Sequence, residues 1–159
     1  RGKNFEVSLY GTEVPNVPDL TYTPETPETP AYTNMLDTVG YKDGYRLSGS
    51  SGNETENIGT DITNHIPCNS NVTVYMKNVL APYTSDNNYL HFIACYDENK
   101  AYIGGYSITL CNNVEHDGDG NITSFQTPAG TQYKDTAYIR IGVQDINETS
   151  IITVNEPIE

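Results

Sequence analysis

The sequence predicts an all-β protein in which residues 34–159 form a jelly-roll-type antiparallel β-sandwich. Composition is the first reason: Ile and Val together number 23 against 7 Leu, and Tyr supplies 13 of the 16 aromatic residues, which favours strands over helices. Periodicity is the second reason, because short alternating runs recur about every 8–12 residues with turn sequences between them, and no helical period is found. The sequence has no Trp and no Cys pair flanking a core aromatic residue, which favours a jelly roll over an immunoglobulin-like sandwich.

The segment before the sandwich divides into a short strand and a linker. Residues 4–10 alternate apolar and polar side chains, so they predict a strand, and we expect segment 1–10 to be an arm that pairs with a neighbouring copy or the end of another domain. Residues 11–33 predict a linker, because five of the nine prolines lie between Pro15 and Pro30 and the Thr-Pro-Glu repeats there favour polyproline II. An ordered strap along the sandwich is the alternative.

Turn and strand signals alternate throughout the sandwich region. The expected strands are, in chain order, 45–47, 61–67, 71–79, 89–97, 101–110, a short run within 116–125, 136–143 and 150–154. The run 89–97 is the most apolar, so we expect a central strand covered on both faces. A four-residue turn, Asp97–Lys100, joins it to the next run and predicts a hairpin.

Alternation within the runs predicts which side chains face the core. The run ending at Val143 directs this residue, Ile139 and Ile141 inward. Its remaining long side chains, Tyr138 and Arg140, are expected to point outward. The expected core residues are Val72, Val74, Phe92, Ala94, Ile108, Ile139, Ile141 and Val154.

The balance of charge excludes two classes of partner. Lys and Arg number 8 while Asp and Glu number 21, which gives a formal net charge of −13. Nucleic-acid binding requires clustered Lys and Arg, and an anionic membrane surface attracts basic segments, so we expect neither nucleic acid nor membrane as a partner. No run of 18 apolar residues occurs, and no membrane-spanning helix is therefore expected.

The sequence motifs that indicate catalysis are missing from this chain. His65, His91 and His116 lack the spacing of a metal hydrolase, no G-x-S-x-G motif occurs, and no glycine-rich loop opens a helix. With 21 acidic residues, a pair of carboxylates suited to a glycosidase carries no information. We therefore expect a protein that is not an enzyme and needs no cofactor, and we keep a glycan-degrading enzyme as a lesser alternative.

Three cysteines, Cys68, Cys95 and Cys111, have neither the number nor the spacing of a zinc site. Cys95 lies inside an apolar run and Cys111 ends one, so we expect buried free thiols that behave as small apolar side chains. One disulfide with one free thiol is the alternative.

One local pattern has the spacing of a calcium loop. Asp117, Asp119 and Asn121 offer oxygen ligands at alternate positions, which is what a hard cation needs. The pattern fails further on, because Ile122 stands where a calcium loop needs Gly and Pro128 where it needs Glu. Asp-Gly and Gly-Asn are also common hairpin-turn sequences, so we expect a turn without metal and keep calcium as a weak alternative.

The tyrosines supply the best candidate for a ligand site. Tyr41, Asp43, Tyr45 and Arg46 surround a glycine turn, Gly40–Gly44, which we expect to project them from a loop. A tyrosine ring can stack on the C–H bonds of a sugar, while carboxylate, guanidinium and hydroxyl groups bind sugar hydroxyls. The competing interpretation is structural, with the same residues packing within the framework of the sandwich.

Several stretches of the chain resemble one known module. They are GYKDGYRLSGSSG at 40–52, ITNHIPCNSNVTVYMKNV at 62–79, YLHFIACYDENKAYIGGY at 89–106, FQTPAG at 125–130, AYIRIG at 137–142 and SIITVNEPI at 150–158. Together they are similar to a jelly-roll module, like that of carbohydrate-binding modules, found in tail, baseplate, fibre and decoration proteins of tailed bacteriophages. Residues 68–71 depart from the Gly/Lys-rich loop of that module, so properties carried by that loop do not transfer.

The resemblance implies a function without a catalytic residue. It points to a non-enzymatic structural or display module on the surface of a bacteriophage virion, assembled in an oligomer with other virion proteins, for which adsorption to host-surface glycans is a candidate role. The alternative is a carbohydrate-binding module of a secreted or surface-anchored bacterial protein, located outside the cell or on its surface.

Overall fold

The residues that the computed structural model describes are 22–25, 31–83 and 91–159. Ala31–Glu159 form one compact unit. The predicted strand 4–10 lies outside the described residues, as does most of the predicted linker 11–33, of which residues 22–25 contain neither helix nor strand. Within the described part of the chain, no helix is long and apolar enough to cross a membrane.

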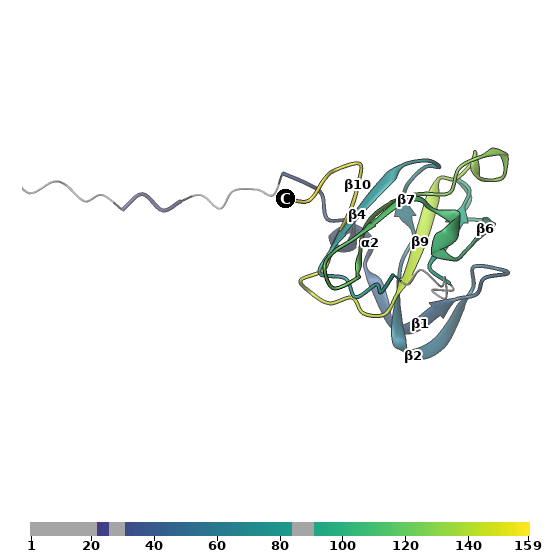
Figure 1. The fold of residues 1–159 in the computed structure, drawn as a ribbon, viewed down its shortest axis with the longest axis horizontal. Coiled ribbons are helices and arrows are strands. Elements are labelled where there is room, and N and C mark those ends of the chain that lie inside the picture. The colour runs from purple at the N-terminus through teal and green to yellow at the C-terminus, as the bar shows by residue number, and fades with distance from the viewer. Residues whose placement is uncertain (1–21, 26–30, 84–90) are drawn as a thin grey trace, which may run out of the picture. The chain divides into compact units, whose positions relative to one another are not determined.

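Two antiparallel sheets pack as a sandwich, which confirms the prediction of an all-β sandwich (Figure 1). The six-stranded sheet has the order β1 (Tyr41–Leu47), β2 (Glu54–Thr63), β9 (Tyr138–Val143), β5 (Ile93–Tyr96) and β6 (Tyr102–Tyr106), and β3 (Ile66–Pro67) also pairs with β9. The four-stranded sheet has the order β10 (Ile151–Val154), β4 (Thr73–Lys77), β8 (Ile122–Gln126) and β7 (Asn112–His116). The jelly-roll connectivity stays a prediction.

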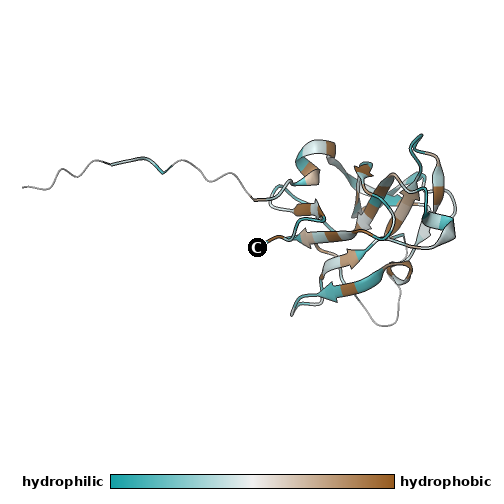
Figure 2. Cartoon of the chain, turned by 90° about the horizontal axis from the view of Figure 1, so that it is seen from above, coloured by the Kyte–Doolittle hydropathy of each residue, from teal (hydrophilic) through white to brown (hydrophobic). Residues whose placement is uncertain are grey.

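The main core lies between the two sheets. Ile139 and Ile141 of β9 and Val74 of β4 are fully buried in it, and the rings of Phe92 and Phe125 meet edge to face with centroids 5.1 Å apart. Apolar and polar residues follow one another along several of the strands, as the hydropathy colouring shows (Figure 2). The expected core residues that are buried in this core are Val74, Phe92, Ile108, Ile139 and Ile141, and those that are partly buried against it are Val72 and Val154. Ala94 corrects the prediction, because it is buried in a second cluster on the other face of the six-stranded sheet.

The three cysteines are free and buried, as the composition of their surroundings predicted. Burial raises the pKa of Cys68 and of Cys95 to about 12, and it raises the pKa of Cys111 as well. A thiol with such a pKa is almost entirely protonated at neutral pH, so these side chains act as packing groups rather than nucleophiles.

Short helical segments occur in the sandwich although the sequence has no helical period. The helix α2 (Met35–Val39) begins after Asn34, whose side chain accepts a hydrogen bond from the backbone N–H of Leu36, and Leu36 itself is buried. A correction concerns the run 101–110, where β6 ends early and a 3₁₀ helix, η2 (Ile108–Leu110), follows. Another 3₁₀ helix, η3 (Thr131–Tyr133), precedes β9. These segments span one turn each, which is too short to produce a helical period in the sequence.

Strand β1 corrects the prediction of a projecting loop at Gly40–Gly44. It begins at Tyr41, and Asp43 pairs with Asp61 while Tyr45 pairs with Glu56, so Gly44 stands opposite residues 57–60 of β2 in an irregular pairing that we call the bulge at Gly44. Gly44 has φ +78°, a left-handed conformation that favours glycine. The alternation of side chains along β1 shifts by one residue at Gly44, so the bulge decides which residues of β1 share a face.

Asp61 fixes this bulge from the neighbouring strand. Its carboxylate accepts hydrogen bonds from the backbone N–H of Gly44 at 3.1 Å and of Ile146 at 2.8 Å, and the residue is 2% exposed. Burial raises the pKa of Asp61, and the nearby Asp43 carboxyl adds to the increase. One side chain thus joins the edge of the six-stranded sheet to the loop that follows β9.

Arg140 points away from the main core, as its position in β9 predicted, but it is only 4% exposed. The guanidinium donates from Nε to the carbonyl oxygen of Thr63 at 2.9 Å and from a terminal nitrogen to Glu54 Oε1 at 2.8 Å. The side chain therefore points outward as predicted, and it is buried there because β2 supplies both partners and covers the guanidinium.

Candidate functional site

The face of the six-stranded sheet that turns away from the main core carries a second cluster of side chains, which we call the outer-face cluster. Alternation places these residues there, because Ile93 and Cys95 of β5 face the main core while Ala94 and Tyr96 face the other way. The apolar and aromatic members are Tyr45, Leu47, Ile62, Ala94, Tyr96, Tyr102 and Tyr138. The polar members that contact or flank them are Lys42, Glu54, His65, Lys100 and Arg140.

Tyr96 lies at the centre of the aromatic part. Its ring meets His65 edge to face with centroids 4.5 Å apart and Tyr102 with centroids 5.9 Å apart, and His65 in turn lies 6.2 Å from Tyr138. Tyr96 is buried, whereas the rings of its neighbours are half-buried. The cluster therefore presents to solvent the edges and faces of several rings that are fixed by one another.

The loop between β1 and β2 is fastened to this cluster. The hydroxyl of Tyr96 donates to the carbonyl oxygen of Gly52 at 2.7 Å, and the hydroxyl of Tyr102 donates to that of Gly49 at 2.9 Å. The hydroxyls of these two tyrosines are consequently used in holding the loop. Tyr45 and Tyr138 are the half-buried tyrosines of the cluster whose hydroxyls take no part in fastening it.

A network of charges runs along one side of the cluster. Glu54 joins Lys42 through one carboxylate oxygen and Arg140 through the other, and Lys42 Nζ also lies 4.8 Å from the centre of the Tyr45 ring. Burial raises the pKa of Glu54, but the hydrogen bonds and positive charges of Lys42 and Arg140 outweigh it and leave this pKa below its usual value. Glu54 is thus held as a carboxylate with both oxygens occupied.

The other side of the cluster carries a lysine above an aromatic ring. Lys100 is exposed, and its Nζ lies 5.3 Å from the centre of the Tyr138 ring. Burial lowers the pKa of the nearby His65, and the positive charges of Arg140 and Lys100 lower it further, so this imidazole is neutral at pH 7. The groups here offer an aromatic face, a neutral imidazole and an ammonium within a short stretch of surface.

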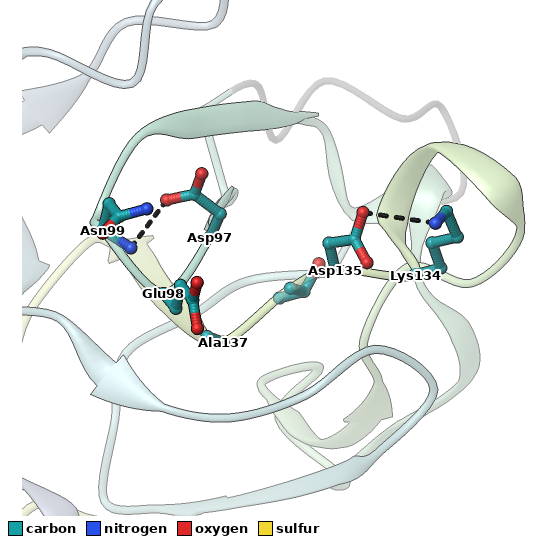
Figure 3. Close-up of a pocket in the computed structure, with 7 residues that line it drawn as sticks. Asp97, Glu98, Asn99, Lys134, Asp135 and Ala137 are labelled. Carbon is teal, nitrogen blue, oxygen red and sulfur yellow. Dashed lines mark hydrogen bonds and ion pairs between the residues drawn. The ribbon is translucent and has the colours of Figure 1, made fainter.

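A pocket adjoins this side of the cluster. It has a volume of about 430 Å³ and lies between the turn after β5 and the segment before β9. Figure 3 shows the two sides of the pocket, with Asp97, Glu98 and Asn99 on one side and Lys134 and Asp135 on the other. Lys100 follows the first side in the chain and Tyr138 follows the second, so the pocket lies next to the cluster.

Strand β1 divides the four residues that the sequence predicted as a ligand site. Tyr45 shares the outer face with Lys42, which pairs opposite Ile62. Tyr41, Asp43 and Arg46 lie on the other face of the strand, because the bulge at Gly44 shifts the alternation by one residue. The structure therefore does not bring the four side chains together, and a role for any of them in binding stays a prediction.

The three residues of the weak calcium alternative lie in a turn. Asp117 Oδ1 accepts hydrogen bonds from the backbone N–H groups of Asp119 and Asn121, and Asn121 Oδ1 accepts one from that of Ala81. These contacts are the turn chemistry that the Asp-Gly sequence predicted. In the described parts of the chain, no group of three His, Cys, Asp or Glu side chains is arranged to hold a metal ion.

Most residues of the outer-face cluster are missing from the site that the sequence predicted. Alternation of side chains was the signal that could have found them. It predicted that Tyr138 points outward, and applied to β5 it also predicts that Tyr96 points outward beside Tyr138. His65 and Lys100 reach the cluster from a strand connection and a turn. Such contacts depend on which strands pair, and local sequence does not give that pairing.

Comparison of the chain with models of protein families, with curated proteins and with solved structures finds no match.

Proposed function

We propose that this protein is a non-enzymatic glycan-binding module that uses the outer-face cluster as its binding surface. The observation that carries the proposal is the group of half-buried rings, Tyr45, His65 and Tyr138, fixed by packing and flanked by charged side chains. A rigid aromatic face suits the C–H surface of a sugar ring, and the polar groups beside it suit the hydroxyls. Such a surface is shallow, so we expect dissociation constants between about 1 mM and 1 μM, or about 4–8 kcal/mol.

The electrostatics of the cluster support binding rather than hydrolysis. A glycosidase of the usual kind needs a carboxylic acid whose raised pKa lets it donate a proton, together with a second carboxylate nearby. Glu54 is the carboxylate at the centre of the outer-face charges, and its pKa is lowered because Lys42 and Arg140 occupy both of its oxygens. This arrangement suits a structural ion-pair network and gives no proton donor.

The setting of the module is part of the proposal. The resemblance of residues 34–158 to modules of tailed-bacteriophage structural proteins supports a display module on the virion surface, assembled with other virion proteins in an oligomer. A carbohydrate-binding module of a secreted or surface-anchored bacterial protein would use the same surface. The neighbouring genes distinguish these settings: tail and capsid genes support the first, and genes for anchoring or hydrolase domains support the second.

The test of glycan binding is a glycan array followed by titration of each positive glycan. Tyr138→Ala should abolish binding while leaving the melting temperature nearly unchanged, because the ring is only half-buried. The matched control is Tyr75→Ala, which removes a half-buried tyrosine from β4 in the other sheet and should leave binding intact. If the wild-type protein binds no glycan, or if Tyr75→Ala weakens binding as much as Tyr138→Ala, the outer-face cluster is not a glycan site.

A further inference from the structure

Lys100 is held in place by the turn in which it lies. Its backbone N–H donates to the carbonyl oxygen of Asp97 at 3.0 Å, and Asp97 Oδ1 accepts from the N–H groups of Asn99 and Ala101 at 2.8 and 2.9 Å. The backbone of Lys100 has φ +61°, which this hydrogen-bonded turn stabilises. The lysine stem therefore starts from a defined position, and its ammonium lies over the Tyr138 ring.

The ammonium of Lys100 has no carboxylate counter-charge among the described residues. The ion pairs found there join Lys42 and Arg140 to Glu54 and Lys134 to Asp135. The carboxylate of Asp97, in the same turn, accepts backbone hydrogen bonds instead. In a chain with 21 acidic and 8 basic residues, a lysine on the binding surface without such a partner is the natural position for an anionic group of a ligand.

We propose that the glycan bound by the outer-face cluster is anionic, with its negative group beside Lys100 and a sugar ring against Tyr138. This inference rests on the proposed function and adds the class of sugar. A carboxylate on a sugar ring lies within a few ångströms of the ring's C–H face, so a sugar that packs against Tyr138 beside the ammonium brings the carboxylate to Lys100. Salt screens charges beyond about 8 Å, so the net charge of −13 opposes the approach of an anion mainly through the nearest carboxylates, those of Asp97 and Glu98 in the same turn.

Lysine is a point charge, so it binds a carboxylate and a sulfate alike. The neutral state of His65 at pH 7 adds no second positive charge to the position. The shared chemistry is therefore one negative substituent on a sugar, and the test must separate uronic acids from sulfated sugars.

The test compares acidic polysaccharides with their uncharged counterparts by calorimetric titration at low and high salt. The probes are polygalacturonate, alginate and hyaluronan, each beside its carboxyl-reduced form, and dextran sulfate beside dextran. We expect the wild-type protein to bind acidic polymers more tightly than their neutral forms, with a preference that falls as salt rises. Lys100→Gln should lose about two- to fivefold in affinity for the acidic polymer and nothing for the neutral one, as expected for an exposed ion pair.

The control for this test is Lys77→Gln, which removes an exposed lysine from β4 of the other sheet and should leave both affinities unchanged. Preference for uronic acids alone or for dextran sulfate alone would support the proposal and name the group. Equal affinity for the charged and neutral polymers, or a preference that Lys100→Gln leaves intact, would overturn the anionic ligand while glycan binding itself stands. Absence of binding to every polymer would overturn both proposals.

Discussion

Glu54→Gln tests whether the buried guanidinium of Arg140 depends on its counter-charge. The side chain of Arg140 is 5% exposed and that of Glu54 is 29% exposed, so the pair lies between a surface pair and a buried one. Loss of one partner costs about 3–5 kcal/mol for a buried pair and up to about 1 kcal/mol for an exposed one. Because Arg140 keeps its hydrogen bond to Thr63 and water can reach the site of Glu54, we expect a loss of about 2–3 kcal/mol.

Urea denaturation monitored by circular dichroism measures this loss, and the melting temperature should fall by about 10 °C. The control is Glu56→Gln, which removes an exposed carboxylate two residues away in β2. Glu56 forms no ion pair with described residues, so this variant should change stability by under about 0.5 kcal/mol. If the two variants unfold at the same urea concentration as the wild type, the interpretation of Glu54 as a structural counter-charge is wrong.

The same pair predicts a dependence on pH. The pKa of Glu54 is lower in the folded protein than its unfolded value of 4.5, so its ionised form stabilises the fold above that pH. The contribution is lost as pH falls through the folded pKa, where the carboxyl takes up a proton. The difference in unfolding free energy between wild type and Glu54→Gln should therefore be full at pH 7 and shrink below about pH 4.5. A difference that is constant from pH 7 to pH 3 would contradict this assignment.

Two further predictions concern the interior. The thiols of Cys68 and Cys95, with pKa values of about 12, and of Cys111 should stay unreactive towards a thiol reagent at pH 8 and all react once denaturant unfolds the protein; rapid labelling of the native protein would contradict their burial. Gly105→Ala should lower the free energy of unfolding by at least about 2 kcal/mol, because Gly105 has φ +148° and a Cβ there would lie 2.2 Å from the carbonyl oxygen of Ile93. The control is Gly118→Ala, whose Cβ would meet nothing within 4 Å and which should be close to neutral in the same melting experiment.

Alternation and turn chemistry were sufficient to predict the main core and several strands. Ile139 and Ile141 face inward because every second residue of β9 is apolar, and the turn Asp97–Lys100 joins β5 to β6 as its sequence indicated. Strand β7 was not predicted, because it is an edge strand whose residues are almost all polar and exposed. An edge strand with this composition has no alternation to detect.

The candidate site was harder to predict than the fold, because it depends on contacts between distant parts of the chain. Gly44 was interpreted as a turn residue, but it forms a bulge that only the pairing of β1 with β2 defines. Arg140 was directed to the correct face, yet its burial requires Glu54 and Thr63, each more than 70 residues away. Local sequence gives the direction of a side chain, and the partner strand decides whether solvent reaches it.

The edges of the two sheets bear on how copies of this protein can meet. Among the strands of the described residues, pairing is irregular at three of the four end strands: β1 pairs irregularly with β2 at Gly44, β6 shifts register against β5, and β7 shifts twice against β8. A strand from a second molecule needs a straight row of free N–H and C=O groups, and bulged edges do not offer one. The remaining end strand, β10, is only four residues long. Sheet extension from copy to copy through these four strands is therefore disfavoured.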